Sequence, residues 1–231
     1  IESARQAGVK HFVFSSTAAV YGEPEIVPIK EDAKLEPTNV YGRTKLMIEQ
    51  MLSDYSKIYG MTYVALRYFN AAGADPSGEI GEDHTPETHL IPLVLDAALG
   101  KRPHITVFGT DYPTEDGTCV RDYIHVNDLA SAHVLAMNYL HDGGESTVFN
   151  LGSGNGFSVK AIIETAKEVT GIDIPVEYGD RRAGDPGTLI ASSDKIKSVL
   201  GWNPVFSNVK DVLKDAWGWH QFHPKGYDNK K

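Results

Sequence analysis

Tyr41 and Lys45 are the pair in this sequence whose types and spacing could move a proton. Residues four apart near the start of a helix share a face, so the ammonium can lie beside the phenol. A phenol titrates near pH ~10, and work as a base at neutral pH requires a pKa lower by roughly 3 units, which corresponds to about 4 kcal/mol. A neighbouring ammonium supplies ~1–3 units, and a second positive charge nearby would complete the shift.

The spacing alone is weak evidence, because the chain contains it a second time at Tyr227 and Lys231. An exposed helix that carries both residue types by chance is commoner than a catalytic pair. The context of Tyr41 favours catalysis, because the pair follows an apolar run, residues 11–14, that ends in the hydroxyl residues 15–17. The linking loop is long enough to bring the hydroxyl groups and the pair together.

The elements that must position this pair alternate between strand and helix. Residues 11–14 and 62–68 are predicted strands, and apolar residues recur at helical spacing from about 39 to 59, where Gly60 ends the helix. Such a crossover implies parallel strands of an α/β sheet. Further strands are predicted at 105–108, 123–124, 147–151 and 175–178, and further helices at 91–99, 125–140, 159–170 and after a capping Ser207.

Three predicted strand ends are polar or rich in glycine, at residues 15–17, 69–70 and 152–154. Open α/β sheets bind ligands at the carboxyl ends of their strands. We therefore expect these three ends to converge on one crevice.

Composition narrows the possible partners. The 231 residues allow one large domain or two interleaved ones, and the net charge of 22 − 31 = −9 disfavours nucleic acid as a partner of the whole chain. A local basic pocket for a phosphorylated small molecule remains compatible with this net negative charge.

The apolar stretch 90–95 is interrupted by Pro92 and is far shorter than the ~20 residues of a membrane span. Cys119 is the only cysteine, so we predict a reducing, cytoplasmic compartment.

Several motifs together resemble the extended short-chain dehydrogenase/reductase family. They are Phe-Ser-Ser-Thr-Ala-Ala-Val-Tyr-Gly at 14–22, Tyr-Gly-Arg-Thr-Lys at 41–45 and Arg-Tyr-Phe-Asn-Ala-Ala-Gly at 67–73. The motifs at 111–118, 120–126, 150–154 and 181–185 are similar to those of UDP-glucose 4-epimerases. The resemblance covers essentially the whole chain. It implies interconversion of UDP-glucose and UDP-galactose in galactose metabolism, through a 4-keto intermediate with transient hydride transfer to bound NAD.

The resemblance implies a role for each matching residue. Tyr41 corresponds to the catalytic base, and Lys45 to the residue that binds the nicotinamide ribose and lowers the pKa of the tyrosine. Thr17 stands where the family usually has serine; it keeps the hydroxyl group that bonds the sugar oxygen and the tyrosine, with a stiffer rotamer. Phe69 corresponds to a further cofactor contact.

Substrate contacts are implied in the same way, and they comprise Thr17, Asn70, His89, Arg121, Arg182 and Asp185. The two arginines would grip the diphosphate, and the aspartate would bind the uridine ribose. His89 stands where a substrate-contacting amide is common. Leu189 is a candidate gate for N-acetylated sugars, and its intermediate size leaves their acceptance open.

Structural explanations compete with these roles. Arg121 and Asp122 could form a surface ion pair, Phe69 could be a core residue, and Asn70 and Asp185 could form turns. No metal site is predicted, because the histidines at 220 and 223 have no carboxylate or cysteine set nearby in the sequence. The cysteine at 119 lacks a paired base, which disfavours nucleophilic catalysis.

The resemblance further implies a partial Rossmann-like parallel sheet, formed by residues 1–74 and 123–156, interleaved with a smaller α/β substrate domain of residues 75–122 and 157–231. The glycine-rich dinucleotide turn of the family is not in the sequence, and the glycines at 152–156 fit a late strand. We therefore expect the carboxyl-terminal two-thirds of an epimerase that is a homodimer when intact.

Two alternatives remain open. A 4,6-dehydratase or decarboxylase of the same family is disfavoured, because Ala18 and Ala19 stand where dehydratases typically have an Asp-Glu pair. A catalytically inert fragment that at most binds a UDP-sugar, with weak or no NAD binding, is the second alternative.

Overall fold

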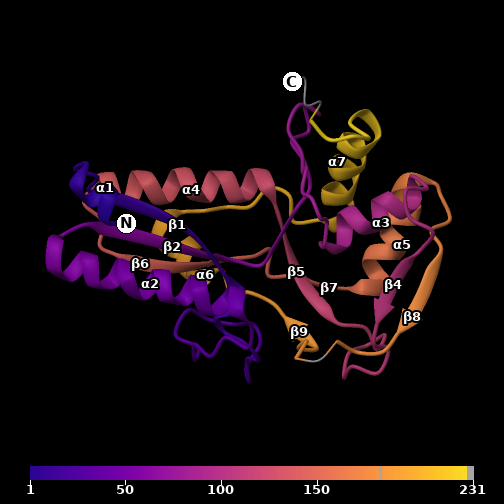
Figure 1. Ribbon diagram of the computed structural model, residues 1–231, viewed down its shortest axis with the longest axis horizontal. Coiled ribbons are helices and arrows are strands. Elements are labelled where there is room, and N and C mark those ends of the chain that lie inside the picture. The colour runs from indigo at the N-terminus through magenta and orange to yellow at the C-terminus, as the bar shows by residue number, and fades with distance from the viewer. Residues whose placement is uncertain (183, 228–231) are drawn as a thin grey trace. The chain divides into compact units, whose positions relative to one another are not determined.

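The computed structural model describes residues 1–182 and 184–227, and the chain forms two compact units (Figure 1). Unit 1 contains Ile1–Phe69, Asp128–Gly154 and Leu189–Pro204. Unit 2 contains Asn70–Asn127, Asn155–Thr188 and the residues from Val205 on. The chain passes between the two units at positions close to the predicted domain boundaries. The prediction assigned residues 189–204 to the substrate domain, whereas these residues pack in unit 1. The roles assigned to the two domains stay a prediction.

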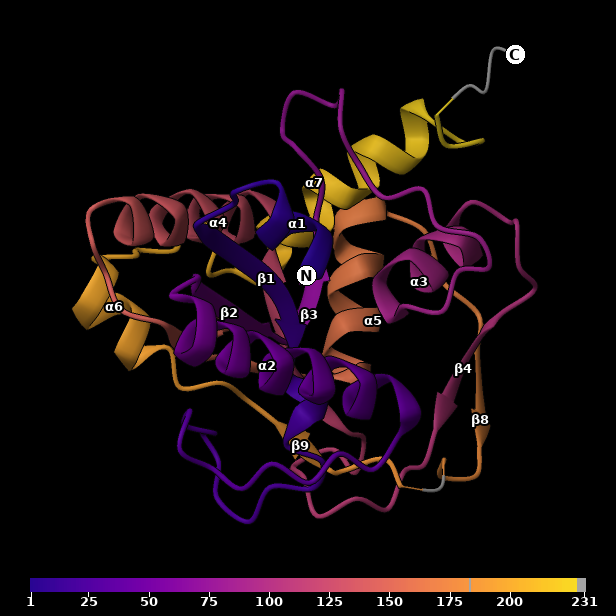
Figure 2. The same cartoon turned by 60° about the vertical axis from the view of Figure 1, so that its left-hand side comes forward.

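Unit 1 is built on a parallel three-stranded sheet in the order β1-β2-β6. Its strands are β1 (His11–Thr17), β2 (Thr62–Tyr68) and β6 (Thr147–Leu151), and its helices are α1 (Glu2–Gln6), the short 3-10 helix η1 (Ala18–Val20), α2 (Val40–Tyr59), α4 (Val126–His141) and α6 (Asp194–Leu200). Figures 1 and 2 show α2 and α4 on opposite faces of this sheet. The predicted strand 11–14 is longer than expected, so the hydroxyl residues 15–17 belong to β1 itself.

Helix α2 has clear local determinants at both ends. The side chain of Asn39 accepts a hydrogen bond from the amide of Gly42 at 2.8 Å, which caps the amino terminus. Gly60 ends the helix with a φ of 70°, a left-handed conformation that favours glycine. Leu52 of α2 and Leu66 of β2 are fully buried, so the helix is held against the sheet by apolar contact.

Unit 2 contains β3 (Asn70–Ala72), which pairs in parallel with β5 (Val120–His125), while β7 (Gly156–Ser158) pairs antiparallel with β5. A separate parallel pair is formed by β4 (Ile105–Phe108) and β8 (Val176–Gly179). The helices are α3 (Leu90–Ala98), α5 (Val159–Thr170) and α7 (Val209–Phe222), and β9 (Thr188–Leu189) follows β8. The fully buried Leu95, Ile162 and Leu213 join the three helices in one core.

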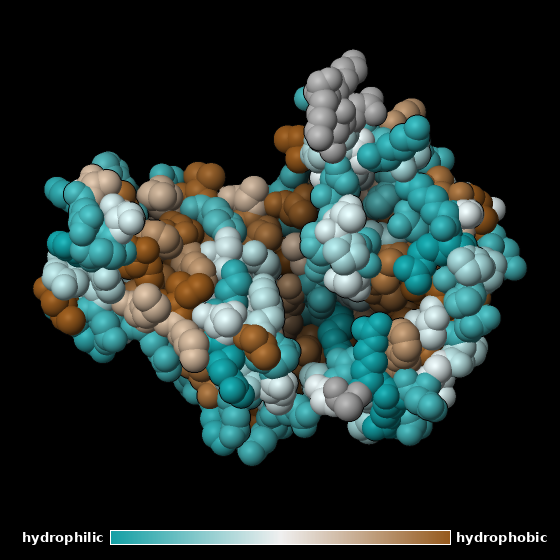
Figure 3. Space-filling model, viewed as in Figure 1, coloured by the Kyte–Doolittle hydropathy of each residue, from teal (hydrophilic) through white to brown (hydrophobic). Residues whose placement is uncertain are grey.

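Polar and apolar residues are interspersed on the face shown in Figure 3. Within the described residues, no helix combines the length and the apolar character that crossing a membrane requires.

Candidate functional site

Unit 1 brings Thr17, Tyr41 and Lys45 together at the carboxyl end of β1. Thr17 is the last residue of β1, and Tyr41 lies in the first turn of α2. The Thr17 hydroxyl lies near enough to the Tyr41 phenol to lower the pKa of that phenol. The ammonium of Lys45 lies 5.6 Å from the centroid of the Tyr41 ring. Tyr41 is 52% exposed, so its phenol can be reached by a ligand.

Burial and Thr17 act on the pKa of Tyr41 in opposite directions. Burial is the largest influence and raises the pKa above its ordinary value, while the nearby Thr17 hydroxyl lowers it. Lys45 Nζ donates to the carbonyl oxygen of Ser15 at 2.9 Å. The role of Lys45 in lowering the pKa of Tyr41, together with a second positive charge, stays a prediction.

A glycine lets α2 approach the segment that follows Thr17. A Cβ atom at Gly42 would lie 2.4 Å from the carbonyl oxygen of Ala19, closer than any real Cβ contact with backbone. Gly42 directly follows Tyr41, so this close approach holds the phenol near the end of β1.

A buried ion pair also fixes α2 on the sheet. Arg67 Nη2 donates to Glu49 Oε2 at 2.6 Å, and the two side chains are only 4% and 5% exposed. Ser16, the neighbour of Thr17, donates to the same carboxylate. Tyr41, Lys45 and Glu49 follow one another at four-residue steps of α2, so the ion pair sets the orientation of the face that carries Tyr41. Sequence analysis missed this pair, although a charged residue inside each of two apolar patterns was a visible signal.

Unit 2 contains a cavity of about 340 Å³, within the usual range for small-molecule sites. Its lining includes five residues that sequence analysis assigned to the substrate: Asn70, His89, Arg121, Arg182 and Asp185. They come from β3, the start of α3, β5 and the loop after β8, which are far apart in the chain. The guanidinium groups of Arg102, Arg121 and Arg182 and one carboxylate at a single cavity suit a ligand that carries both phosphate and hydroxyl groups.

The charged residues of this cavity interact with one another. Arg121 Nη2 is hydrogen-bonded to Asp185 Oδ1, and Arg121 Nη1 donates to the carbonyl oxygen of Val120 at 2.9 Å. The guanidinium of Arg182 lies 4.0 Å from the centroid of the Phe108 ring. Each arginine is thus held by a contact within unit 2 and presented at the cavity.

The competing structural explanations have different outcomes. Asp122 is fully buried, so the surface location that this explanation requires is wrong. Asn70 lies in β3 rather than in a turn, where it donates to the carbonyl oxygen of Asp122 at 3.0 Å. The amide of Asp185 donates to the carbonyl oxygen of Arg182 at 3.3 Å, which agrees with a turn.

Phe69 and Leu189 pack against the same apolar cluster in unit 1, formed by Ala18, Val20, Tyr21 and Ile29. The core explanation of Phe69 therefore has support, and its contact with a cofactor stays a prediction. Cys119 lines the cavity of unit 2 but is buried, and burial raises the pKa of its thiol. The raised pKa opposes formation of a nucleophilic thiolate. Of the second Tyr-Lys pair, Lys231 lies outside the described residues.

Comparison with known families gives one match over residues 1–152, to the NAD dependent epimerase/dehydratase family. The chain belongs to this family. Among curated members, a UDP-glucose 4-epimerase of Halalkalibacterium halodurans is 58% identical over 219 residues, which are 95% of this chain and 66% of that protein. A UDP-glucose 4-epimerase of Streptococcus mutans is 54% identical over 230 residues, which are 100% of this chain and 69% of that protein. The chain thus spans about two thirds of the length of these relatives.

Solved structures of the family agree with this assignment. One UDP-glucose 4-epimerase structure superimposes with a TM-score of 0.95 at 56% identity, over 98% of this chain and 69% of the other. The UDP-glucose 4-epimerase of Bifidobacterium longum in complex with NAD+ and UDP has a TM-score of 0.91 at 38% identity, over 98% of this chain and 68% of the other. The predicted α/β fold and the predicted family are confirmed.

Proposed function

We propose that the protein interconverts UDP-glucose and UDP-galactose by inverting carbon 4 of the hexose, with NAD as its cofactor. One observation carries the proposal most strongly: residues of four distant segments, each assigned to the nucleotide sugar from sequence motifs, line one cavity of unit 2. The names of the relatives and the Thr17, Tyr41 and Lys45 cluster of unit 1 support it.

The proposed chemistry of unit 1 is proton transfer. Tyr41 takes the proton of the 4-hydroxyl group, and the Thr17 hydroxyl holds the sugar oxygen and the phenol in line. When bound, NAD would supply the acceptor for the hydride of carbon 4 and the source of that hydride for the other face. Tyr41 would give its proton back to the 4-keto oxygen in the return step. Tyr41, Lys45 and Thr17 fit the nicotinamide ribose, because hydroxyl and ammonium donors gather at the carboxyl end of a parallel strand. Phe69 is the further proposed contact.

Unit 2 supplies the proposed anchor. Arg121 and Arg182 bind the diphosphate through charge-assisted hydrogen bonds, and Asp185 binds the uridine ribose. Asn70 and His89 line the same cavity. Because the anchor holds the diphosphate rather than the reacting carbon, the 4-keto sugar can turn over and present its other face without leaving.

A 4,6-dehydratase is the second candidate, and the residues after β1 oppose it. Ala18 and Ala19 carry only methyl groups, which cannot move a proton in an elimination. A product without its 6-hydroxyl group would decide in favour of the dehydratase.

The activity is tested in a chimera, in which this chain is joined to the part of the Halalkalibacterium halodurans relative that lies outside the aligned region. UDP-galactose is supplied with NAD, and proton NMR follows the formation of UDP-glucose. Turnover that disappears in the Tyr41→Phe chimera supports the proposal. UDP binding without turnover supports the inert alternative, and a chimera that neither binds UDP nor turns over contradicts both.

We further propose a cytoplasmic location and a homodimer. The single, buried Cys119 supports a reducing compartment. Sedimentation equilibrium of the chimera tests the dimer, and a monomeric mass at micromolar concentration would contradict it.

A further inference from the structure

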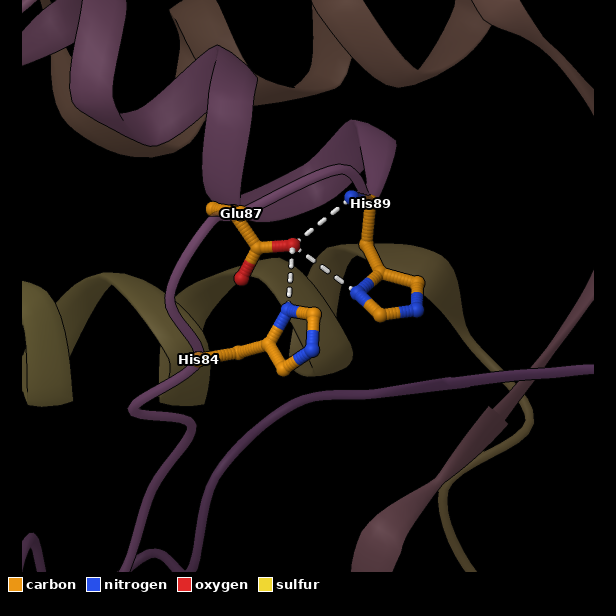
Figure 4. Close-up of side chains that lie close together, drawn as sticks. All are labelled: His84, Glu87 and His89. Atoms are coloured by element: carbon orange, nitrogen blue, oxygen red, sulfur yellow. Dashed lines mark hydrogen bonds and ion pairs between the residues drawn. The ribbon is translucent and has the colours of Figure 1, made fainter.

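Two histidines and two glutamates of unit 2 converge just before α3. One ring nitrogen each of His84 and His89 and one carboxylate oxygen of Glu87 all lie within 4.8 Å of one another, and the three side chains point toward one another in Figure 4. Glu87 Oε1 is 2.8 Å from His89 Nδ1 and 3.8 Å from His84 Nδ1. Glu82 Oε1 lies 3.1 Å from His89 Nδ1 and adds a fourth donor.

These separations suit the coordination shell of a small metal ion. A tetrahedral zinc site with bonds of about 2.0–2.1 Å places neighbouring ligand atoms about 3.3 Å apart. The three donor separations of 2.8, 3.1 and 3.8 Å lie on both sides of that value. Since only His84, Glu87 and His89 have ligand atoms that all lie within 4.8 Å of one another, a side-chain rotation of Glu82 would complete the shell.

The central carboxylate is held in place before any ion binds. Glu87 Oε1 accepts hydrogen bonds from the amides of Thr88 at 2.6 Å and His89 at 2.7 Å. The Glu87 side chain is 14% exposed, whereas those of His84 and His89 are each 51% exposed. A cation can thus reach the cluster from solvent and find one of its ligands already oriented.

The charges of the cluster favour a cation as well. Glu82 Oε1 and Glu87 Oε1 lie 3.1 and 2.8 Å from the same atom, His89 Nδ1. A positive ion bound beside both carboxylates would offset the repulsion between their negative charges.

We propose that Glu82, His84, Glu87 and His89 bind one zinc ion. Two imidazole nitrogens and two carboxylate oxygens form a donor set that zinc accepts in tetrahedral geometry, whereas magnesium prefers six oxygen ligands. The site goes beyond the proposed epimerase activity, which needs no metal, and it shares His89 with the cavity of unit 2. Its ligands follow the spacing Glu-x-His-x-x-Glu-x-His from residue 82 to residue 89.

The proposal departs from the sequence expectation of no metal site. That expectation considered His220 and His223, which the structure uses otherwise. His220 is buried, and burial lowers its pKa. His223 stacks on Trp219, and its Nε2 atom lies 3.0 Å from the carbonyl oxygen of Gly78.

Calorimetric titration of the 231-residue chain, without a polyhistidine tag, with zinc chloride tests the site. We expect one zinc ion per chain. His84→Ala should weaken the affinity at least about tenfold, since even the loss of an outer-shell partner costs that much. His84 does not line the cavity of unit 2, so its substitution separates this test from the proposed function. The matched control is His104→Ala, whose imidazole faces Glu177 at 3.2 Å, and it should bind zinc as the unchanged chain does.

Cobalt chloride gives an independent readout, because tetrahedral cobalt absorbs visible light strongly and octahedral cobalt does not. We expect strong absorption with the unchanged chain and its loss in Glu87→Gln, while circular dichroism shows both variants folded. Equal zinc affinity in His84→Ala and the unchanged chain would overturn the proposal. Equal losses in His84→Ala and His104→Ala, which indicate adsorption to surface histidines, would overturn it too.

Discussion

Each unit contains one ion pair next to a candidate site, and the two pairs differ in their surroundings. Arg67 and Glu49 of unit 1 are 4% and 5% exposed, and Ser16 and Tyr21 complete their hydrogen bonds. The Arg121 side chain of unit 2 is 13% exposed and that of its partner Asp185 is 31% exposed, and both line a cavity. Neither side chain of a fully enclosed ion pair can leave the other to bind a ligand, so such a pair stabilises the fold. A pair at a cavity can turn one partner toward a ligand.

The energetic cost of breaking a pair follows the same difference. When one member of an enclosed ion pair is removed, the other charge stays buried with neither a partner nor water, which lowers the free energy of unfolding by several kcal/mol. A guanidinium at a cavity can be rehydrated or bind phosphate, so its loss should change ligand affinity more than folding.

The largest effect is expected for Glu49→Ala. Arg67 would be left buried without its carboxylate, and the free energy of unfolding should fall by about 3–5 kcal/mol. Urea unfolding of the chain measures it. The control is Glu36→Ala, whose pair with Lys34 is 69% and 79% exposed and should contribute at most about 1 kcal/mol. Equal losses of unfolding free energy in Glu49→Ala and Glu36→Ala would contradict the distinction between enclosed and exposed ion pairs.

The next largest effect is expected for Tyr41→Phe. Loss of the phenol oxygen removes the proposed base, so turnover of the chimera should fall at least ~100-fold with little change in stability. Tyr59→Phe, at the exposed end of the same helix, is the control and should turn over normally. Near-normal turnover of Tyr41→Phe would remove this residue from its proposed role.

Arg121→Met tests the ion pair of unit 2, through its effect on the affinity for UDP. A charge-assisted hydrogen bond contributes about 1.5–3 kcal/mol, so the affinity for UDP should fall roughly 10–100-fold. Arg181→Met is the matched control: Arg181 Nε pairs with Asp111 at 2.6 Å, and its side chain is 41% exposed and outside the cavity lining. Isothermal titration with UDP compares them, and similar affinities of the two variants would contradict the assignment of Arg121.

Asn39→Ala should have the smallest effect. It removes the cap that accepts the amide of Gly42, at a cost of about 1 kcal/mol in unfolding free energy. Asn39→Asp keeps an acceptor and should recover most of that loss. A cost as large as that of Glu49→Ala would show that the cap, and not the buried ion pair, holds α2 in place.

Local patterns predicted most of the long elements. The apolar spacing and Gly60 placed α2 within a residue of its bounds, and β2, β4, β6 and α5 agree with their predicted ranges. The short elements β3, β7 and α6 were not predicted, because each has too few residues to show a repeating apolar pattern. The last helix is capped by Asn208 rather than Ser207, because both residue types can cap and only the folded backbone chooses between them.

The sequence by itself determined the family and the parallel α/β character, because both depend on side-chain type and short-range periodicity along the chain. The roles of the residues that it assigned to the ligands stay predictions. The tertiary structure alone decided which charges meet. It paired Arg67 with Glu49 and Arg121 with Asp185, and it directed Lys45 to a carbonyl oxygen of β1. Burial and partner choice depend on residues distant in the sequence, and burial and partners together set the energy of a charge.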